Sequence, residues 1–311
     1  AGFQRVYHER IAPHLLANEG ARLQAVQQCK TRVTWGALAA IAAAALAYAM
    51  FRDVQAAVAV GVLGGGAIWA YAYGPLAEIG ARLKDQYCRA MASAMGAHFQ
   101  IKGFNPAAFA RMCLLKIAPE HKHAYFEDCF AGFYKGASFD LYEAHLSKPK
   151  MHMDGRIRET TVFQGQLIRL HFPRGFSGVT IVRREAGFLN MFGGGVIEGR
   201  QLQRVGLTPS AFERAFEVWS TDQVEARYLL HPMMLERLIA LEAAFKGEKL
   251  RCAFEGGSIL IAIEGGNLFE PGDLFQSFHD PVRARRIIEE FASMFRVMDY
   301  VLTAQSLRPV A

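Results

Sequence analysis

The sequence predicts an α+β protein. An N-terminal helical transmembrane hairpin is expected to precede a cytoplasmic antiparallel sheet, or partial barrel, with a long C-terminal helix. Three observations predict this class. Two uncharged apolar runs follow each other near the N-terminus, at 35–51 and 56–76. Alternating apolar and polar residues then dominate much of 126–266, and an apolar stripe at helical spacing follows Pro281.

The two apolar runs are expected to cross a membrane. Each approaches the ~20 residues that a bilayer requires, and aromatic residues cluster toward the run ends, as interfacial aromatics do. Only residues 52–55 separate the runs, so the pair returns the chain to the side that it came from. These features favour a two-span hairpin over 35–76. The alternative is a pair of buried core helices in a soluble protein.

Charged residues around the hairpin predict its orientation. The flanking cations are Arg5, Arg10, Arg22, Lys30 and Arg32 before the hairpin, and Arg82, Lys84 and Arg89 after it. The turn between the two runs carries one Arg and one Asp. Cytoplasmic flanks are enriched in Lys and Arg, so both termini are expected in the cytoplasm.

Small residues recur at four-residue spacing in both runs. Gly36 and Ala40 lie on one stripe of the first run, and Gly61 and Gly65 on one stripe of the second. Such stripes let helices approach closely in lipid. We expect the two spans to pack on each other. A further possibility is that they also bind another membrane protein or a second copy of the chain.

The remaining residues divide around the hairpin. Residues 1–34 are predicted to form a cytoplasmic amphipathic helix, 77–124 a helical connector, and 125–311 a cytoplasmic α+β domain. Within that domain we expect a hairpin over 130–146 with a Lys-Gly turn, strands at 160–172, 178–185, 201–206 and 216–220, and a second hairpin over 250–266. Helices are expected at 221–245, notched at Pro232, and at 281–303.

Composition argues against a metal site or a cofactor. The five cysteines are scattered and contain no CxxC pair, which disfavours a disulfide framework or a zinc ribbon. Two histidines in HKHAYFEDC (121–129) are too few for a defined metal site. The glycine clusters at 193–199 and 254–257 lack the spacings of phosphate-binding loops. We therefore predict no cofactor and no metal.

Basic residues concentrate in one stretch of a chain whose formal net charge is +6. Residues 148–204 hold ten Lys and Arg against four Asp and Glu. The candidate binding residues there are Arg169, Arg174, Arg183 and Arg184. Beside a cytoplasmic leaflet such residues attract anionic headgroups. The alternative is a solvated strand face with local acidic partners. Nucleic acid is not expected, because no stacking motif of the RNA-binding kind is present.

The stretch FEVWSTDQVEARYLLHPMMLERL (216–238) holds residue types found in hydrolase sites. Ser220, Asp222 and Glu225 also fit two overlapping capping boxes at the start of a helix. Capping explains them without chemistry, because a nucleophilic serine needs a base and an oxyanion hole in fixed geometry. A binding surface is the interpretation that we favour for Trp219, Arg227 and His231.

Several long strings in the C-terminal half resemble a known family. They are TVFQGQLIRLHFPRGFSGVTIVRRE, LQRVGL, FERAFEVWSTDQVEARYLLHPMMLERL and SILIAIEGGNLFEPGDLF. Together they resemble the bacterial membrane proteins grouped as domain of unknown function 3137, over residues 125–302. The resemblance implies a membrane-tethered cytoplasmic domain and no established reaction. It also implies a bacterial inner-membrane location.

These observations favour a membrane-anchored, non-enzymatic binding or accessory protein. Its cytoplasmic domain is expected to engage a protein partner or anionic lipid, as a subunit of a larger membrane complex. The alternative is a membrane-tethered hydrolase with a site between Trp219 and His231. The expected partners are membrane lipid and a membrane protein or a second copy of the chain.

Overall fold

The fold is taken from a computed structural model, which describes residues 12–151, 155–184, 195–197, 199–206, 216–246, 248–267 and 281–306. The chain separates into two compact units. The helical unit comprises 1–94 and 269–281, and the sheet unit comprises 95–268 and 282–311. Helices combine with a large antiparallel sheet, so the predicted α+β class is confirmed.

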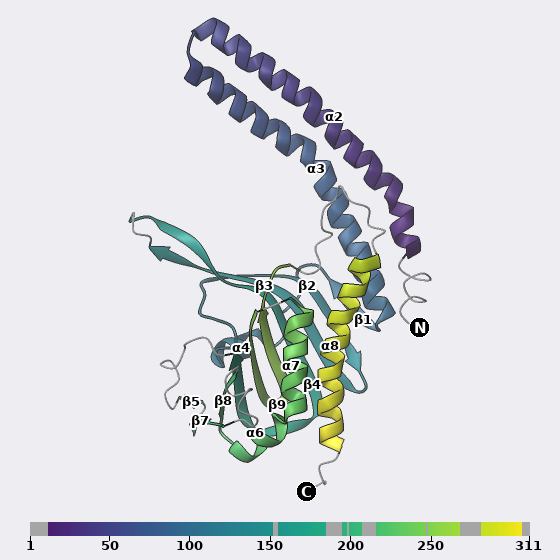
Figure 1. The fold of residues 1–311 in the computed structure, drawn as a ribbon, viewed down its shortest axis with the longest axis vertical. Helices are drawn as coiled ribbons and strands as arrows, with labels where there is room; N and C mark the ends of the chain where they lie inside the picture. Colours follow the sequence, from purple (N-terminus) through teal and green to yellow (C-terminus); the bar gives the residue numbers. More distant parts are fainter. Residues whose placement is uncertain are drawn as a thin grey trace. The chain divides into compact units, whose positions relative to one another are not determined.

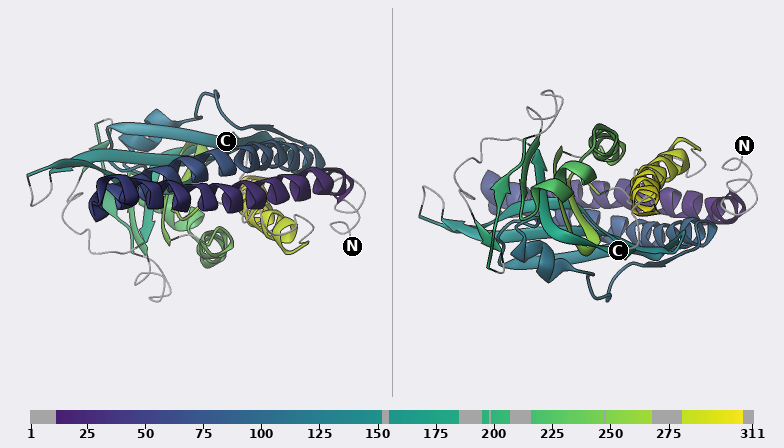
Figure 2. Two further views of the ribbon diagram at one scale, coloured as in Figure 1. Left: turned by 90° about the horizontal axis from the view of Figure 1, so that it is seen from above. Right: turned by 90° about the horizontal axis from the view of Figure 1, so that it is seen from below.

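Two long helices make up the described part of the helical unit. Helix α2 spans Ala12–Phe51 and helix α3 spans Val54–Ala94. They lie side by side (Figures 1 and 2). In the turn between them the Asp53 carboxylate accepts a hydrogen bond of 2.8 Å from Gln55 N. Both helices are long and apolar enough to cross a membrane, judged by length and composition.

The small residues of the two helices do not contribute equally to their contact. A Cβ atom placed on Gly36 would lie 2.1 Å from Ile68 Cγ2, so the Ile68 side chain of α3 fills the space that a side chain at this position of α2 would need. Gly61 faces the Ala44 methyl group, and Gly64 faces that of Ala40. No described atom lies within 4 Å of a Cβ placed on Gly65. The contacting stripe of α3 therefore carries Gly64 in place of the predicted Gly65.

Replacing Gly36 with Leu is expected to push α2 away from α3, because overpacking of this kind costs ~1–3 kcal/mol. A disulfide between Ala44→Cys and Gly61→Cys measures the separation, in a background without the native cysteines. A Cβ on Gly61 would lie 3.7 Å from Ala44 Cβ, a suitable disulfide distance. We expect Gly36→Leu to lower the cross-linking yield and Gly65→Leu to leave it unchanged. Equal yields in both variants would contradict this packing.

The sheet unit contains one seven-stranded antiparallel sheet. Its strands are β1 (Ala97–Gln100), β2 (His123–Tyr134), β3 (Ala137–Met151), β4 (Ile157–Arg184), β7 (Gln203–Arg204), β8 (Phe216–Ser220) and β9 (Glu248–Glu264). The order is β1-β2-β3-β4-β8-β7, and β9 also pairs with β4. Strands β5 (Val196–Ile197) and β6 (Arg200–Gln201) form a separate pair.

Several elements that were predicted from local sequence patterns are confirmed. Strands β2 and β3 form the expected hairpin, and its turn residues Lys135 and Gly136 have φ of 49° and 84°. Two consecutive positive φ angles are typical of the turns that match the twist of antiparallel strands. Strand β8 occupies the predicted residues, and the predicted helix after it divides at Pro232 into α6 (Gln223–Leu229) and α7 (Pro232–Ala244).

The predicted second hairpin over 250–266 is wrong. These residues belong to the single strand β9, and both of its halves pair with β4. The predicted strands at 160–172 and 178–185 are likewise both parts of β4. Gly256 and Gly257, which suggested a turn, instead allow β9 to approach β4 closely where the two strands bend. A Cβ on Gly257 would lie 2.8 Å from a ring carbon of His171, where the β4–β9 register shifts.

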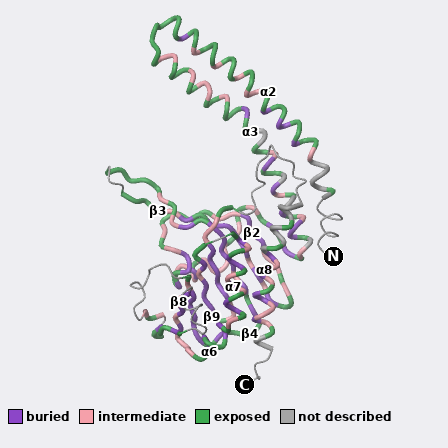
Figure 3. Tube along the Cα trace, in the orientation of Figure 1, coloured by how far each residue is buried: buried purple, intermediate pink, exposed green. Residues whose placement is uncertain are grey.

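Helices cover both faces of the sheet. Helices α7 and α8 (Pro281–Ser306) lie on one face, and the short helix α4 (Phe109–Leu114) lies on the other (Figures 1 and 2). On the α8 side, Phe291 packs against Phe130 and Phe139. On the α4 side, a buried cluster includes Met112, Leu115, Tyr142, Phe163, Leu167, Ile181 and Ala253. Figure 3 shows the buried strands between these helices.

Candidate functional site

A pocket of about 1060 Å³ opens in the sheet unit. The turn after α4 and strands β3, β4, β8 and β9 all contribute to its wall. Its described cationic side chains are Lys116, Lys148, Arg183, Arg184, Lys249 and Arg251. The carboxylates in the wall are Glu120 and Glu217, and part of the wall is apolar. The pocket is therefore a cationic cavity with an apolar side.

Strand register explains why arginines and apolar side chains share this wall. In one row across the sheet, Arg183 of β4 lies opposite Glu217 of β8 and opposite Arg251 of β9. Two residues along β4, Ile181 lies opposite Trp219 and Ala253. Side chains two residues apart on a strand project from the same face. A charged row and an apolar row therefore line the pocket together.

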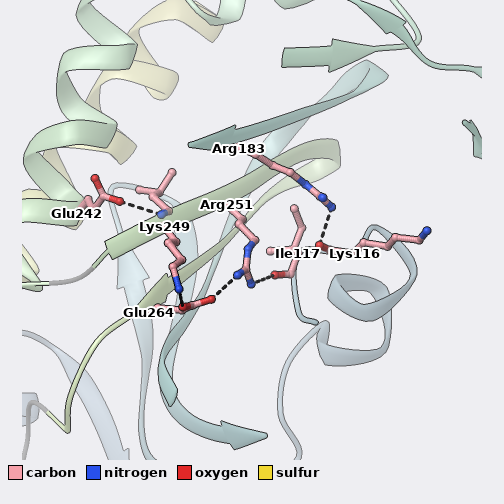
Figure 4. Close-up of polar contacts among 8 residues, drawn as sticks. Lys116, Ile117, Arg183, Glu242, Lys249, Arg251 and Glu264 are labelled. Carbon is pink, nitrogen blue, oxygen red and sulfur yellow. Dashed lines mark hydrogen bonds and ion pairs between the residues drawn. The ribbon is translucent and has the colours of Figure 1, made fainter. Parts of the chain in front are cut away.

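Two consecutive backbone carbonyls hold the two arginines of the charged row. Arg183 Nη2 donates to Lys116 O at 2.7 Å, and Arg251 Nη1 donates to Ile117 O at 3.3 Å. Figure 4 shows both guanidinium groups directed toward this turn. Each arginine is thereby positioned by a group that carries no net charge. The positive charge of the pair is not neutralised by these two contacts.

The closeness of the two arginines has an electrostatic cost. Burial, together with the positive charge of Arg251, lowers the pKa of Arg183 to about 10, while Glu217 acts in the opposite direction. Arg183 therefore remains protonated at neutral pH. Like charges directly opposite each other in a sheet are destabilising. An anion placed between them would relieve that repulsion.

Two further carboxylates pair with the cations of the wall. Glu264 contacts Arg251 and accepts a hydrogen bond of 3.0 Å from Lys249 Nζ (Figure 4). Glu242 of α7 pairs with Arg184 and accepts from Leu250 N at 2.8 Å. With these two, four carboxylates face the six cations of the wall. The six described cations of the wall outnumber these four carboxylates by two.

The structure brings together only some of the residues that the sequence suggested. Arg183, Arg184 and Trp219 line the pocket. Arg169 instead pairs with Asp140, through an Nε–Oδ2 distance of 2.6 Å. The side chain of Arg174 lies outside the described residues. The two remaining candidates lie on the α6–α7 segment.

Those two candidates make local contacts. Arg227 donates to Gln223 Oε1 on the exposed side of α6, at 3.3 Å. His231 is the N-cap of α7, and its Nδ1 accepts from Met233 N at 3.4 Å. Sequence reasoning missed Lys116, Lys148, Lys249 and Arg251. No local motif marks them, because three separate segments supply them: the turn after α4, β3 and β9. Only the strand register would have placed Arg251 beside Arg183.

The residues at the start of α6 are engaged in backbone contacts. Asp222 is the N-cap, and its Oδ1 accepts from Val224 N and Glu225 N at 3.0 and 2.9 Å. Ser220 is fully buried, and its Oγ accepts from Asp222 N at 3.0 Å. Glu225 accepts from Ser177 N and Gly178 N at 2.9 and 2.7 Å. Its carboxylate thus ties α6 to β4.

One carboxylate cluster has the composition of a cation site. Oxygen atoms of Glu127, Asp128 and Glu143 lie within 4.8 Å of one another. Asp128 and Glu143 both have further partners, so the cluster alone does not assign a metal. The neighbouring histidines are engaged elsewhere. His121 Nδ1 donates to Pro119 O at 2.9 Å, and His123 lies 3.4 Å from Glu159.

Comparison with known proteins supports the family resemblance. A protein-family model described as "Protein of unknown function (DUF3137)" matches residues 161–302. No curated protein matches the chain. Among solved structures, the chain is similar to the crystal structure of the mycobacterial trehalose monomycolate transport factor A, TtfA. The TM-score is 0.39 at 14% identity, over 74% of this chain and 99% of that chain. That likeness is too distant to support an inference about this protein.

Proposed function

We propose that this chain is a membrane-anchored, non-enzymatic binding protein whose sheet unit recognises an anionic partner in the cationic pocket. The observation that carries the proposal is the excess of two positive charges around a cavity of about 1060 Å³. Positive charge that converges on a cavity attracts anions and raises their rate of association. Such a protein would serve as an accessory subunit of a larger membrane assembly.

The proposed anchor consists of the apolar parts of α2 and α3. Large apolar side chains such as Trp35, Leu63 and Trp69 are exposed in the helical unit, as expected for surfaces that face lipid. The flanking Lys and Arg favour a bacterial inner-membrane hairpin over 35–76 with both termini in the cytoplasm. Residues 1–34 would then be the cytoplasmic helix.

The predicted boundary between a helical connector over 77–124 and a domain over 125–311 does not fit, because strand β1 and the turn residues Lys116 and Ile117, which hold the two arginines of the pocket, belong to the sheet unit. The binding domain would therefore begin near residue 95.

Single-cysteine labelling in intact cells tests the anchor. A cysteine in place of Asp53, in a background without native cysteines, is expected to react with a membrane-impermeant maleimide applied from outside the inner membrane. A cysteine in place of Ala311 is expected to react only after the membrane is opened. Protection of the first position, or labelling of the second in intact cells, would exclude this topology.

The geometry argues against the alternative of a hydrolase between Trp219 and His231. Ser220 is fully buried, and its hydroxyl contacts Thr180 Oγ1 at 2.9 Å and the backbone. The Asp222 carboxylate caps α6, and His231 caps the following helix. A nucleophilic serine would need a base within hydrogen-bond reach and donors for an oxyanion. These residues are instead used to start two helices.

The capping role of Asp222 leads to a stability prediction. Asp222→Ala should lower the free energy of unfolding by about 1 kcal/mol, because two N–H groups of α6 lose their acceptor. Asp222→Asn retains an oxygen at the cap and should remain near wild type. Urea denaturation of the full chain in a neutral detergent measures both. A hydrolase site predicts instead that Asp222→Asn abolishes an activity and that Asp222→Ala leaves the free energy of unfolding unchanged.

Recovery of partners from membranes tests the binding role of the pocket. The full chain would be isolated in gentle detergent from cells that express either wild type or the double variant Arg183→Gln, Arg251→Gln. Quantitative mass spectrometry would compare the proteins and lipids that co-purify. We expect partners that are retained by wild type and lost from the double variant. Identical partners in both samples would contradict a binding role for the pocket.

A further inference from the structure

We infer that the pocket binds the phosphate group of an organic phosphate monoester between Arg183 and Arg251, with the organic part against the Trp219 side. The inference rests on the proposed function, because it names the ligand class of the same pocket. The shared chemistry is a terminal phosphate, whether it belongs to a lipid headgroup or to a soluble ester.

The arrangement of the two arginines favours a tetrahedral oxyanion. They lie directly opposite each other on β4 and β9, where side chains start ~5 Å apart. Guanidinium groups bind phosphate oxygens through paired N–H donors. The carbonyls of Lys116 and Ile117 fix both groups before any ligand arrives. Little side-chain freedom is then lost on binding, which favours affinity.

Charge distinguishes phosphate from carboxylate as the ligand. The described residues of the wall and their partners leave an excess of two positive charges. A phosphate monoester carries about −1.5 to −2 at neutral pH, whereas a carboxylate carries a single charge. The monoester therefore matches the excess, and a single carboxylate would leave one of the two excess positive charges of the wall uncompensated.

The apolar side of the pocket indicates that the phosphate is attached to an organic group. Trp219, Ile181, Val162 and Leu202 all line the cavity. A volume of about 1060 Å³ corresponds to a small-molecule site and far exceeds what one phosphate fills. Aromatic or aliphatic groups next to the phosphate would cover the Trp219 side.

Glu264 acts as an internal competitor in this arrangement. Its carboxylate contacts both Arg251 and Lys249. An incoming phosphate must share these cations with Glu264, so removal of the Glu264 charge should strengthen phosphate binding. A gain of affinity is a useful test because a misfolded variant cannot produce it.

Isothermal titration calorimetry of the full chain in a neutral detergent tests the inference. The probes are phenyl phosphate, inorganic phosphate and benzoate at equal ionic strength. We expect phenyl phosphate to bind more tightly than inorganic phosphate, and benzoate to bind most weakly. Tighter binding of benzoate than of phenyl phosphate would overturn the phosphate assignment while leaving a cationic binding pocket. Failure of all three anions to bind would remove the proposed function as well.

Variants assign the binding to the arginine pair. Arg183→Gln and Arg251→Gln should each weaken phenyl phosphate binding by roughly tenfold or more, since each removes charge-assisted hydrogen bonds. Arg251→Lys retains the charge but not the paired N–H donors of the guanidinium group, so its affinity for phenyl phosphate should lie between those of wild type and Arg251→Gln. Glu264→Gln should bind phenyl phosphate more tightly than wild type. The matched control is Arg82→Gln, whose exposed arginine pairs with Glu78 in α3. Unchanged affinity in both pocket Arg→Gln variants, or weaker binding by Glu264→Gln, would overturn the assignment.

Bilayer discs separate the two sources of phosphate. The full chain is placed in discs of phosphatidylcholine with or without phosphatidic acid, a lipid that carries a phosphate monoester. If a lipid headgroup is the ligand, phosphatidic acid should occupy the pocket and lower the apparent affinity for phenyl phosphate. If the ligand is a soluble ester, that affinity should be the same in both discs.

Discussion

Glu225→Ala is expected to lower the free energy of unfolding by about 3 kcal/mol, one of the larger effects available in the sheet unit. The Glu225 side chain is only 6% exposed, and it accepts hydrogen bonds from Ser177 N and Gly178 N at 2.9 and 2.7 Å. Truncation leaves two backbone donors without this acceptor in a place that water reaches poorly. Each such donor costs about 1–3 kcal/mol. Urea denaturation followed by circular dichroism measures the change.

Two matched substitutions separate this effect from a loss of negative charge. Glu225→Gln retains one acceptor oxygen and should lie between the alanine variant and wild type. Glu236→Ala removes a carboxylate from an exposed position of α7 and should stay within about 0.5 kcal/mol of wild type. Equal destabilisation by Glu225→Ala and Glu236→Ala would show that the two backbone contacts are unimportant.

Gly165→Ala should cost on the order of 3 kcal/mol or more, because the backbone of β4 cannot accept a side chain there. Gly165 has a φ of 154°, and a Cβ at this residue would lie 2.1 Å from Ile263 O and 2.9 Å from Gly265 N. All the crowding atoms belong to backbone, so no rotamer change relieves them. The readouts are the yield of folded protein and the urea midpoint.

Gly266→Ala is the matched control for Gly165→Ala. It lies just beyond the strand that pairs with Gly165, and a Cβ there would meet no described atom within 4 Å. We expect this variant to fold with a midpoint close to that of wild type. If Gly165→Ala is as stable as Gly266→Ala, the close approach of β4 and β9 does not exist in solution.

Features encoded by neighbouring residues could be predicted from the sequence. The turn at Lys135 and Gly136, strand β8 and the interruption at Pro232 all depend on residues close together in the chain. Backbone conformation at such places is set by local sterics and by local hydrogen bonds. The start of α6 at Asp222 belongs to the same class, because an N-cap acts within one turn.

Features that depend on strand register could not be predicted. The glycines at 256 and 257 suggest a turn by composition, yet in the structure they allow β9 to bend along β4. Arg169 and Arg183 belong to the same basic stretch, but Arg169 meets Asp140 while Arg183 meets Arg251. Which arginine meets an acid and which meets another arginine is decided by pairing between distant strands. The register between distant strands cannot be predicted from a single sequence.

Strand β4 pairs both with its sequence neighbour β3 and with the distant strand β9. This arrangement has a consequence for the order in which the protein folds. Strands β2, β3 and β4 pair with sequence neighbours, whereas β9 reaches β4 only after the intervening segments have been synthesised. Pairings that close long loops form late, because the loop entropy is lost before the contacts compensate for it. Arg251 therefore joins Arg183 in one of the last steps of folding. Affinity for a phosphate ester would then report that β9 has paired with β4. A nascent or truncated protein that ends before β9 would carry Arg183 without Arg251 and would not bind the ligand.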